Sequence, residues 1–293
     1  MAACNGYAML INMSTAAQPF LARAAKDNSI PRTFRKVHGA GNDFILFTDP
    51  AEDRDWPEEA RRLCARGTGI GADGLVVTTR SGPAAFEVRC FNADGSAATM
   101  CGNALRCAAF CAARDHGDQE LSLVMAGTGH RAQVRGDDVA VTSEAGPVVP
   151  RQVQVRWDGT GFTFEAVHTG TEHVITIVDD VDNVDVAGCG RMVRHHAALA
   201  PLGSNVNFVQ VINAQAIRIR TYERGVEAET LSCASGAVAA AAVTRARCLT
   251  GPGPLTVHNQ AGTALEVRPD ASGPPGAAFW VSGPVAITFR GEI

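Results

Sequence analysis

The chain has 293 residues, of which 46% are hydrophobic, and a formal net charge of −4 at neutral pH. This composition is typical of a globular protein with a substantial core, and the charge argues against the basic surface by which proteins bind nucleic acid or an anionic membrane. No apolar run approaches the roughly 18 residues that a membrane span requires, so a membrane protein is not expected.

The first 31 residues are predicted to be a peripheral N-terminal leader. They mix apolar, Ala-rich and weakly charged stretches before Pro31. A disordered or dispensable leader is favoured over a weak transit peptide or an upstream start codon followed by Met9 or Met13.

Short alternating segments predict a chain dominated by strands. In chain order, the predicted strands are residues 44–48, 75–79, 86–91, 121–124, 132–134, 139–142, 153–157, 174–178, 207–211, 217–222, 255–258, 264–267, 279–281 and 286–289. The predicted helices are residues 57–66, 102–116, 186–199 and 234–248. This many strands around so few helices indicate the α+β class.

The order of these elements suggests an internal duplication. In each half, several strands lead to a polar turn, a cysteine and one Ala-rich helix, after which hairpins resume. The prolines and the glycine of residues 144–150 interrupt both periodicities, so this segment is the predicted linker. The predicted N-terminal domain spans residues 32–146 plus 281–293, and the predicted C-terminal domain spans residues 147–280.

Two cysteines open helix-like segments directly after polar turns. Cys101 follows the sequence Phe-Asn-Ala-Asp-Gly at residues 91–95, and Cys233 follows Tyr-Glu-Arg-Gly at residues 222–225. At a helix start, backbone N–H groups and the positive end of the helix dipole lower the pKa of a thiol and attract an anion beside it. For either cysteine alone, a buried structural thiol remains the alternative. Together they predict two acid/base thiols that face one substrate across a cleft between the domains.

The compartment and the cofactor are constrained by cysteine and lysine. The nine cysteines are an odd number in a long chain, which argues for free thiols in a reducing, cytoplasmic compartment. The lysines are Lys26, in the predicted leader, and Lys36. Pyridoxal phosphate needs a lysine for its Schiff base, so thiol chemistry without that cofactor is favoured.

Other motifs favour structural interpretations. Residues 69–74 satisfy Gly-x-Gly-x-x-Gly, but a helix precedes them and a strand follows, the reverse of a dinucleotide site, so a tight turn at a pocket edge is expected. Cys107 and Cys111 have helical spacing and are interpreted as core residues, not metal ligands. The paired histidines at 195–196 are interpreted as structural or solvated. The acidic run at 179–185 lacks the glycine and glutamate of a calcium loop and is interpreted as a solvated turn.

Several motifs in one order resemble the diaminopimelate epimerase family. They are Phe34–Phe44 (Phe-Arg-Lys-Val-His-Gly-Ala-Gly-Asn-Asp-Phe), Thr68–Gly74 (Thr-Gly-Ile-Gly-Ala-Asp-Gly), Asn92–Ser96 (Asn-Ala-Asp-Gly-Ser), Met100–Asn103 (Met-Cys-Gly-Asn), Asn205–Phe208 (Asn-Val-Asn-Phe) and Tyr222–Gly225 (Tyr-Glu-Arg-Gly). The resemblance covers residues 34 to about 240. It implies two similar domains, each a mostly antiparallel, curled and barrel-like sheet around a central helix, with the active site in the cleft between them. It also implies no cofactor and no metal.

The resemblance implies a role for individual residues. Cys101 and Cys233 correspond to the two bases, one a thiolate and the other a thiol, so that protons are exchanged on both faces of a planar carbanion. His173 and Glu223 correspond to residues that tune the two cysteines. The implied substrate-binding residues are Asn42, Gly74, Asn92, Gly102, Asn103, Thr171, Asn205, Arg224, Ala234 and Ser235. Of these, the helix starts at 102–103 and 234–235 would hold the α-carboxylate, and Arg224 would suit a distal carboxylate.

Three departures from the family pattern concern the rest of the substrate. Thr171 stands where the family has an asparagine, and one extra residue lies between Gly225 and Cys233. Ala234 replaces a glycine and adds a methyl group at the carboxylate-binding turn. The residues for α-proton exchange are retained, whereas the distal pocket is altered.

The predicted function is therefore epimerisation of a small-molecule amino acid without pyridoxal phosphate, converting LL-diaminopimelate to meso-diaminopimelate for lysine and peptidoglycan synthesis. One alternative is a racemase or epimerase of the same fold that acts on another amino acid, such as a diamino acid or histidine. A non-catalytic binding protein of this fold and a redox-regulated thiol protein are further alternatives. A homodimer is compatible with the sequence.

Overall fold

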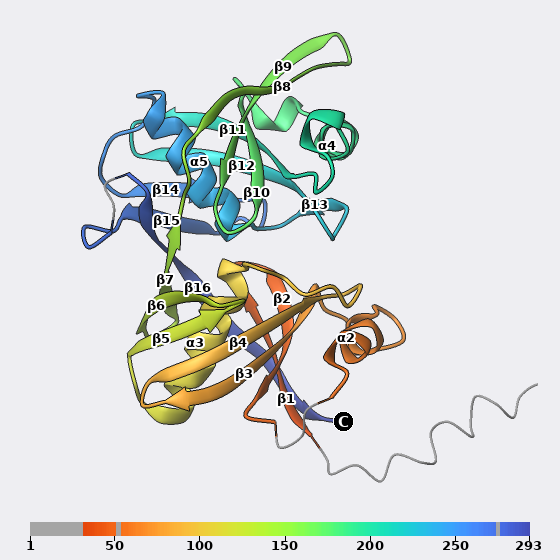
Figure 1. Cartoon of the computed structure of the whole chain (residues 1–293), viewed down its shortest axis with the longest axis vertical. Coiled ribbons are helices and arrows are strands. Elements are labelled where there is room, and N and C mark those ends of the chain that lie inside the picture. The colour runs from red at the N-terminus through yellow and green to blue at the C-terminus, as the bar shows by residue number, and fades with distance from the viewer. Residues whose placement is uncertain (1–31, 51–53, 274–275) are drawn as a thin grey trace, which may run out of the picture. The chain divides into compact units, whose positions relative to one another are not determined.

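The folded chain is mostly β sheet, with a few helices inside and beside the sheet (Figure 1). The structure is a computed structural model, and it describes residues 32–50, 54–273 and 276–293. The predicted leader, residues 1–31, lies outside the described residues. Residues Thr33–Ile293 form one unit. The predicted α+β class is confirmed, and in the described part of the chain no helix is long and apolar enough to cross a membrane.

The first half of the fold is a closed barrel of eight strands around helix α3 (Gly102–His116). Its strands are β1 (Thr33–Gly39), β2 (Asn42–Thr48), β3 (Gly74–Gly82), β4 (Ala85–Asn92), β5 (Glu120–Met125), β6 (Thr128–Arg135), β7 (Asp138–Glu144) and β16 (Ala278–Glu292). Each strand pairs with the next, and β16 closes the barrel by pairing with both β7 and β1. Helix α2 (Trp56–Cys64) packs against β3 and β4.

The second half is an open, curled sheet around helix α5 (Ala234–Ala246). It continues from β16 through β15 (Ala264–Pro269), β14 (Leu255–His258), β12 (Ala216–Glu223), β11 (Asn205–Asn213), β10 (Glu172–Ile177), β9 (Thr160–His168) and β8 (Val149–Trp157). The short strand β13 (Ala228–Thr230) pairs with β12. Helix α4 (Val186–Arg194) packs against β11 and β12.

The predicted internal duplication is present in the order of the elements. In the first half, α2 connects the parallel strands β2 and β3, and α3 connects the parallel strands β4 and β5. In the second half, α4 connects parallel β10 and β11, and α5 connects parallel β12 and β14. The other neighbouring strands are antiparallel. Two similar curled sheets around central helices are thus confirmed, whereas the domain boundaries at residues 147 and 281 remain predictions.

Small side chains allow the two central helices to lie inside the sheets. Helix α5 is rich in alanine and valine and is buried from Ala234 to Thr244, as expected for a helix that is apolar on every face. Cys107 and Cys111, on α3, are 0% and 1% exposed, which confirms their interpretation as core residues. Burial raises the pKa of both thiols.

The N-terminal ends of α3 and α5 meet. A Cβ atom added to Gly102 would lie 2.8 Å from the Cβ of Ala234, so this approach requires a glycine on one side. Cys101 is the N-cap of α3 and Cys233 is the N-cap of α5. Packing of the two helix ends therefore brings the two cysteines to one place.

Three predicted segments are divided or joined differently in the structure. The predicted helix 186–199 ends at Arg194, and residues Ala197–Leu199 form a separate 3-10 helix whose start is capped by His196. The predicted strands 279–281 and 286–289 are one strand, β16, which passes through Gly283 and Pro284. Pro284 lacks an N–H group, but its carbonyl oxygen accepts a hydrogen bond from the Ala40 N–H at 3.2 Å, so the strand continues.

Candidate active site

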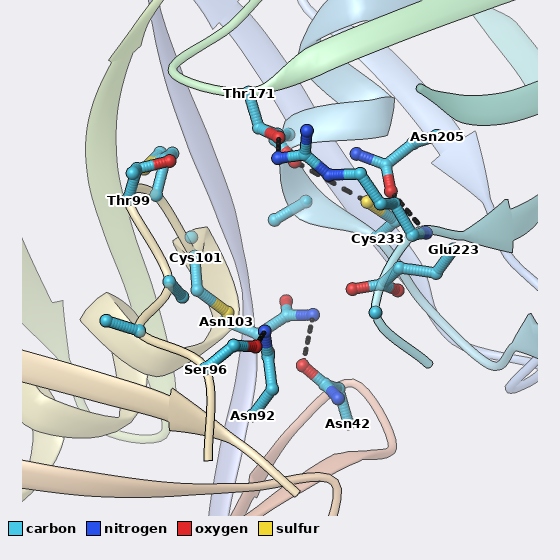
Figure 2. Close-up of a pocket in the computed structure, with 18 of the residues that line it drawn as sticks. Asn42, Asn92, Ser96, Thr99, Cys101, Asn103, Thr171, Asn205, Glu223 and Cys233 are labelled. Atoms are coloured by element: carbon cyan, nitrogen blue, oxygen red, sulfur yellow. Dashed lines mark hydrogen bonds between the residues drawn. The ribbon is translucent and has the colours of Figure 1, made fainter. Parts of the chain in front are cut away.

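A cavity of about 420 Å³ lies where the two helix ends meet, and both sheets contribute to its walls (Figure 2). Twelve of the predicted site residues line it: Asn42, Asn92, Cys101, Gly102, Asn103, Thr171, Asn205, Glu223, Arg224, Cys233, Ala234 and Ser235. Figure 2 shows Cys101 and Asn103 on one side of this space, and Cys233 and Glu223 on the other. Residues more than 130 positions apart in the sequence thus face one cavity.

Two predicted site residues do not line the cavity. Gly74 lies at the start of β3 between Phe44 and Asn92 of the neighbouring strands, where a Cβ atom would come within 2.7 Å of the Phe91 carbonyl oxygen. His173 is 1% exposed and lies behind Ser235, with its Nε2 3.0 Å from the Ser235 hydroxyl. Gly74 therefore permits close strand packing, and His173 reaches the cavity only through another side chain.

Each cysteine accepts a hydrogen bond from the backbone of the helix that it caps. The Sγ of Cys101 accepts from the Ala104 N–H at 3.4 Å, and the Sγ of Cys233 accepts from the Gly236 N–H at 3.4 Å. Unpaired N–H groups and the positive helix end favour negative charge on a sulfur at this position. Both sulfur atoms are thus held where a thiolate is stabilised.

The two thiols nevertheless differ in acidity. The pKa of Cys101 is lowered, chiefly because the Cys90 thiol donates a hydrogen bond to it, with a further contribution from the Ala104 N–H. The pKa of Cys233 is raised, first by burial and then by the negative charge of Glu223. The geometry therefore favours a thiolate at Cys101 and a neutral thiol at Cys233.

Glu223 and His173 have shifted pKa values for the same physical reason. Burial raises the pKa of Glu223 to about 7, although the Thr230 hydroxyl donates a hydrogen bond to its carboxylate at 2.7 Å. Burial lowers the pKa of His173 to about 3, and the charge of Arg224 lowers it further. His173 is therefore neutral at physiological pH, whereas Glu223 titrates near it.

Side-chain amides connect the two halves across the cavity. The Asn103 amide nitrogen donates to the Asn42 side-chain oxygen and to the Ser232 carbonyl oxygen, both at 3.1 Å. The buried Arg106 guanidinium donates to the Asn103 side-chain oxygen at 2.7 Å. Because Asn42 belongs to the barrel and Ser232 precedes α5, Asn103 positions the two helix ends relative to each other.

Arg224 extends over the other end of the cavity. Its guanidinium donates to the Thr171 hydroxyl at 2.9 Å, and its backbone N–H donates to the Asn205 side-chain oxygen at 2.8 Å. Thr171 is thus a hydrogen-bond partner of Arg224. The guanidinium can bind a carboxylate or phosphate at this end.

The cavity also includes residues that the sequence did not single out as substrate contacts. They are Asp94, Ser96, Ala97, Ala98, Thr99, Met100, Arg194, Gly225 and Glu227. Asp94, Ser96, Met100 and Gly225 belong to motifs quoted above, so the sequence carried a signal for them. Glu227 lies in the lengthened turn with φ of 57°, and Arg194 forms an ion pair with it at 3.1 Å. In the sequence, the extra residue in this turn was the only indication of the Arg194–Glu227 ion pair.

Other residues considered in the sequence lie away from the cavity. The Lys36 ammonium donates to the Asp43 carboxylate and to the Gly71 carbonyl oxygen. The turn at residues 69–73 does not line the cavity, contrary to the predicted pocket edge. In the acidic run, Asp182 forms an exposed ion pair with Arg218, as befits a solvated turn. Within the described residues, no group of three or more His, Cys, Asp and Glu side chains is arranged as a metal site.

Comparisons with known proteins agree on one family. The family model described as diaminopimelate epimerase matches residues 34–150 and 165–273. A diaminopimelate epimerase of Aquifex aeolicus (strain VF5) is 37% identical over 249 residues, which cover 80% of this chain and 88% of that protein. One of Gemmatimonas aurantiaca is 35% identical over 280 residues, which cover 89% of this chain and 99% of that protein.

Solved structures share the fold at low sequence identity. A hydroxyproline epimerase from Agrobacterium vitis, with bound trans-4-OH-L-proline, has a TM-score of 0.70 at 15% identity and covers 90% of this chain and 91% of its own. A predicted epimerase from Pseudomonas aeruginosa has a TM-score of 0.67 at 17% identity, with 89% and 99% covered. These likenesses confirm the two-domain, barrel-like architecture.

Proposed function

Because this chain belongs to the diaminopimelate epimerase family and is an isomerase, we propose that it interconverts LL- and meso-diaminopimelate with Cys101 and Cys233 as the two acid/base groups. The observation that carries the proposal is the pair of helix-capping thiols at one cavity. Inversion at a carbon needs a proton acceptor on one face and a donor on the other, and this pair supplies both.

In the proposed reaction, the Cys101 thiolate removes the α-proton and the Cys233 thiol donates a proton to the opposite face. The enzyme then holds a Cys101 thiol and a Cys233 thiolate, which is the state required for the reverse direction. The lowered pKa of Cys101 and the raised pKa of Cys233 support this starting state, with a thiolate at Cys101 and a thiol at Cys233. His173 and Glu223 act on the cysteines indirectly.

The backbone N–H groups at the two helix starts are suited to the substrate α-carboxylate. Residues 102–103 and 234–235 line the cavity at these starts. Hydrogen bonds from a positive helix end strengthen as negative charge spreads from the α-carbon into the carboxylate. The same groups thus bind the substrate and stabilise the carbanion.

The distal end of the substrate is assigned to the opposite part of the cavity. Arg224 is suited to the distal carboxylate because its guanidinium can form paired, charge-assisted hydrogen bonds. Neutral hydrogen-bond donors and acceptors for the substrate are supplied by other residues that line the cavity: Asn42, Asn92, Thr171 and Asn205. We do not assign a substrate contact to Gly74, because it lies between paired strands.

Deuterium exchange tests this function. In deuterated water, LL-diaminopimelate should gain deuterium at the α-carbon and produce the meso isomer. Cys101→Ser and Cys233→Ser should each slow the conversion by at least about 100-fold, since general acid/base groups contribute this much or more. Undiminished exchange in either variant would exclude the two-base assignment.

A second candidate is a racemase of another amino acid with the same fold. It is favoured by Thr171, by the Glu227 turn and by the Ala234 methyl group, all of which border the cavity. A panel of amino acids in the same assay separates the two: exchange of another substrate with no exchange of diaminopimelate would establish the second candidate. A protein that binds diaminopimelate without any exchange would be a non-catalytic member.

The cellular setting follows from the same assignment. We propose that the reaction serves lysine and peptidoglycan synthesis, and that the protein works in the reducing cytoplasm. In support of the compartment, the described cysteines are free thiols. The two curled sheets are proposed to be the domains 32–146 plus 281–293 and 147–280, with β16 shared between them.

A further inference from the structure

Asn207 is a fully buried polar residue on β11, next to His173 of β10. Its side-chain nitrogen lies 3.1 Å from the Nδ1 of His173 and 3.1 Å from the Val174 carbonyl oxygen. Its side-chain oxygen accepts a hydrogen bond from the Thr221 hydroxyl at 2.9 Å. The side chain is therefore fixed on three sides.

These partners decide which end of the Asn207 amide faces His173. A carbonyl oxygen can only accept hydrogen bonds, so the atom beside the Val174 carbonyl must be the NH2 group. The same NH2 group faces the Nδ1 of His173, which must therefore be the acceptor. In a neutral imidazole, the proton then resides on Nε2.

The low pKa of His173 is consistent with this arrangement. Burial lowers it to about 3, and a protonated ring would direct an Nδ1–H group at the NH2 group of Asn207. His173 is therefore a neutral ring with one hydrogen to donate.

A second amide competes for the Nε2 of His173. The side-chain nitrogen of Asn205 lies 3.4 Å from it, but this nitrogen also donates to the Glu172 carbonyl oxygen at 3.2 Å. Two amides cannot both donate to a neutral imidazole, because one ring nitrogen always carries the proton. The shorter contact with Asn207 favours the Nε2–H form, whose hydrogen the Ser235 Oγ, 3.0 Å from Nε2, can accept.

The hydrogen of the Ser235 hydroxyl is then directed away from His173. Ser235 Oγ accepts from the His173 ring and lies 3.5 Å from the Sγ of Cys233. The chain of donors runs from Asn207 through His173 and Ser235 to Cys233. In this arrangement the Ser235 hydroxyl can donate to the Cys233 sulfur, which already accepts from the Gly236 N–H.

We propose that Asn207 is a positioning residue that holds His173 as the Nε2–H tautomer and thereby directs the Ser235 hydroxyl hydrogen to the Cys233 sulfur. This inference rests on the proposed acid/base role of Cys233. Once Cys233 has given up its proton, the directed hydroxyl stabilises the thiolate. The second hydrogen-bond donor to Cys101 is the Cys90 thiol. The two halves therefore use different side chains, a thiol and a hydroxyl, as the second donor to the sulfur.

Nitrogen-15 NMR of histidine in the unmodified protein tests the first link. The His173 signals, assigned by their loss in His173→Gln, should show a neutral ring protonated at Nε2 from pH 5 to pH 9. A ring protonated at Nδ1, or at both nitrogens, would overturn the proposal. This measurement needs no substrate and no variant of Asn207.

Alkylation tests the link to Cys233. In Ser235→Ala, iodoacetamide at pH 8 should modify Cys233 about tenfold more slowly, as expected for the loss of one hydrogen bond to a thiolate, while Cys101 reacts at its usual rate. In Asn207→Leu, the alkylation of Cys233 should slow by up to the same factor. The His173 signals of this variant should show a mixture of tautomers. Asn213→Leu, at the exposed end of the same strand, is the matched control.

The outcomes separate this inference from the proposed function. Equal slowing of both cysteines, or no slowing of Cys233 in Ser235→Ala, would overturn the directed hydroxyl. If Asn207→Leu does not fold, the nitrogen-15 spectrum of the unmodified protein and the alkylation rates of Ser235→Ala still test the proposal. Because neither readout involves turnover, both results hold even if the protein does not act on diaminopimelate.

Discussion

Cys101 and Cys233 occupy equivalent helix caps, yet different residues surround their thiols. Cys101 receives a hydrogen bond from a neighbouring thiol, Cys90, whereas Cys233 is more deeply buried, and the charge of Glu223 raises the pKa of both. Two sites at equivalent positions of the two halves thus differ in acidity. For a two-base reaction this difference is useful, because one thiol must start ionised and the other protonated.

Glu223→Gln should change the pH dependence of stability. The folded-state pKa of Glu223 is about 7, against 4.5 for an unperturbed glutamate. A raised folded pKa stabilises the folded protein below the unfolded pKa, and this contribution is lost as the pH rises through the folded pKa. Relative to the unmodified protein, the variant should therefore gain stability between pH 5 and pH 8, by at most about 3 kcal/mol at 1.4 kcal/mol for each pKa unit.

Urea unfolding at the two pH values measures this difference. Glu229→Gln is a suitable control, because Glu229 forms an ion pair with Arg220 at 2.7 Å and lies outside the cavity lining. A stability difference that stays constant from pH 5 to pH 8 would contradict the raised pKa of Glu223.

Among the individual residues, sequence motifs predicted most of those that line the cavity. Cysteines after polar turns are recognisable as helix caps, and the asparagines and Arg224 lie in motifs. The hydrogen-bond partners were not predictable, because they come from other strands. Cys90, Asn207 and Thr221 reach the site only through pairing that depends on the three-dimensional fold.

Helices α3 and α5 show how much of an element its own sequence determines. Helix α3 has its predicted bounds, residues 102–116, because Cys101 caps its start and Gly117 ends it in a left-handed conformation. Helix α5 starts as predicted and ends two residues early. Where the local signals were weaker, the prediction was wrong: β1, β9 and β13 were not predicted as strands. The adjacent Arg35 and Lys36 interrupt the alternation in β1, and Gly161 lies near the start of β9, so pairing with neighbouring strands decides their conformation.

Gly102→Ala should push the ends of α3 and α5 apart. The new methyl group would lie 2.8 Å from the Cβ of Ala234, so the helix starts must shift. Overpacking of this kind costs about 1 to 3 kcal/mol. Denaturant unfolding should show this loss, and epimerisation should slow because the two cysteines move with the helices.

The Ala234→Gly replacement is the complementary change. Ala234→Gly alone should fold and remain active. Combined with Gly102→Ala, it should restore most of the stability and activity lost in Gly102→Ala. If the double variant is as impaired as Gly102→Ala alone, the contact between the two helix starts is not the cause.

On the scale of the whole molecule, strand β16 belongs to both halves. It pairs with β15 in the second sheet and with β7 and β1 in the barrel. Its sequence predicted two separate strands, because glycine and proline usually interrupt a strand. Barrel closure was equally hidden, since it joins Thr33 to Glu292 at opposite ends of the fold. The duplicated order of elements was predictable, whereas the shared strand was not.

The shared strand predicts that the two halves unfold together. Trp56 on α2 reports on the barrel, and Trp157 on β8 reports on the second sheet. Variants in which Trp56 or Trp157 is the only one of the chain's three tryptophans should show coincident fluorescence midpoints in urea. Distinct midpoints would mean that pairing along β16 does not couple the halves.

The meeting of two helix starts has an electrostatic consequence. Each start carries about half a positive charge, so the pair amounts to about one elementary charge in the cavity. In the proposed reaction, one negative charge moves from one sulfur to the other while the proton crosses the substrate. The total charge is conserved, and the negative charge moves from the positive end of α3 at Cys101 to the positive end of α5 at Cys233. The two helix dipoles of the duplicated fold thus contribute equally at both ends of the proton transfer, and the difference between the thiols comes from the side chains around them.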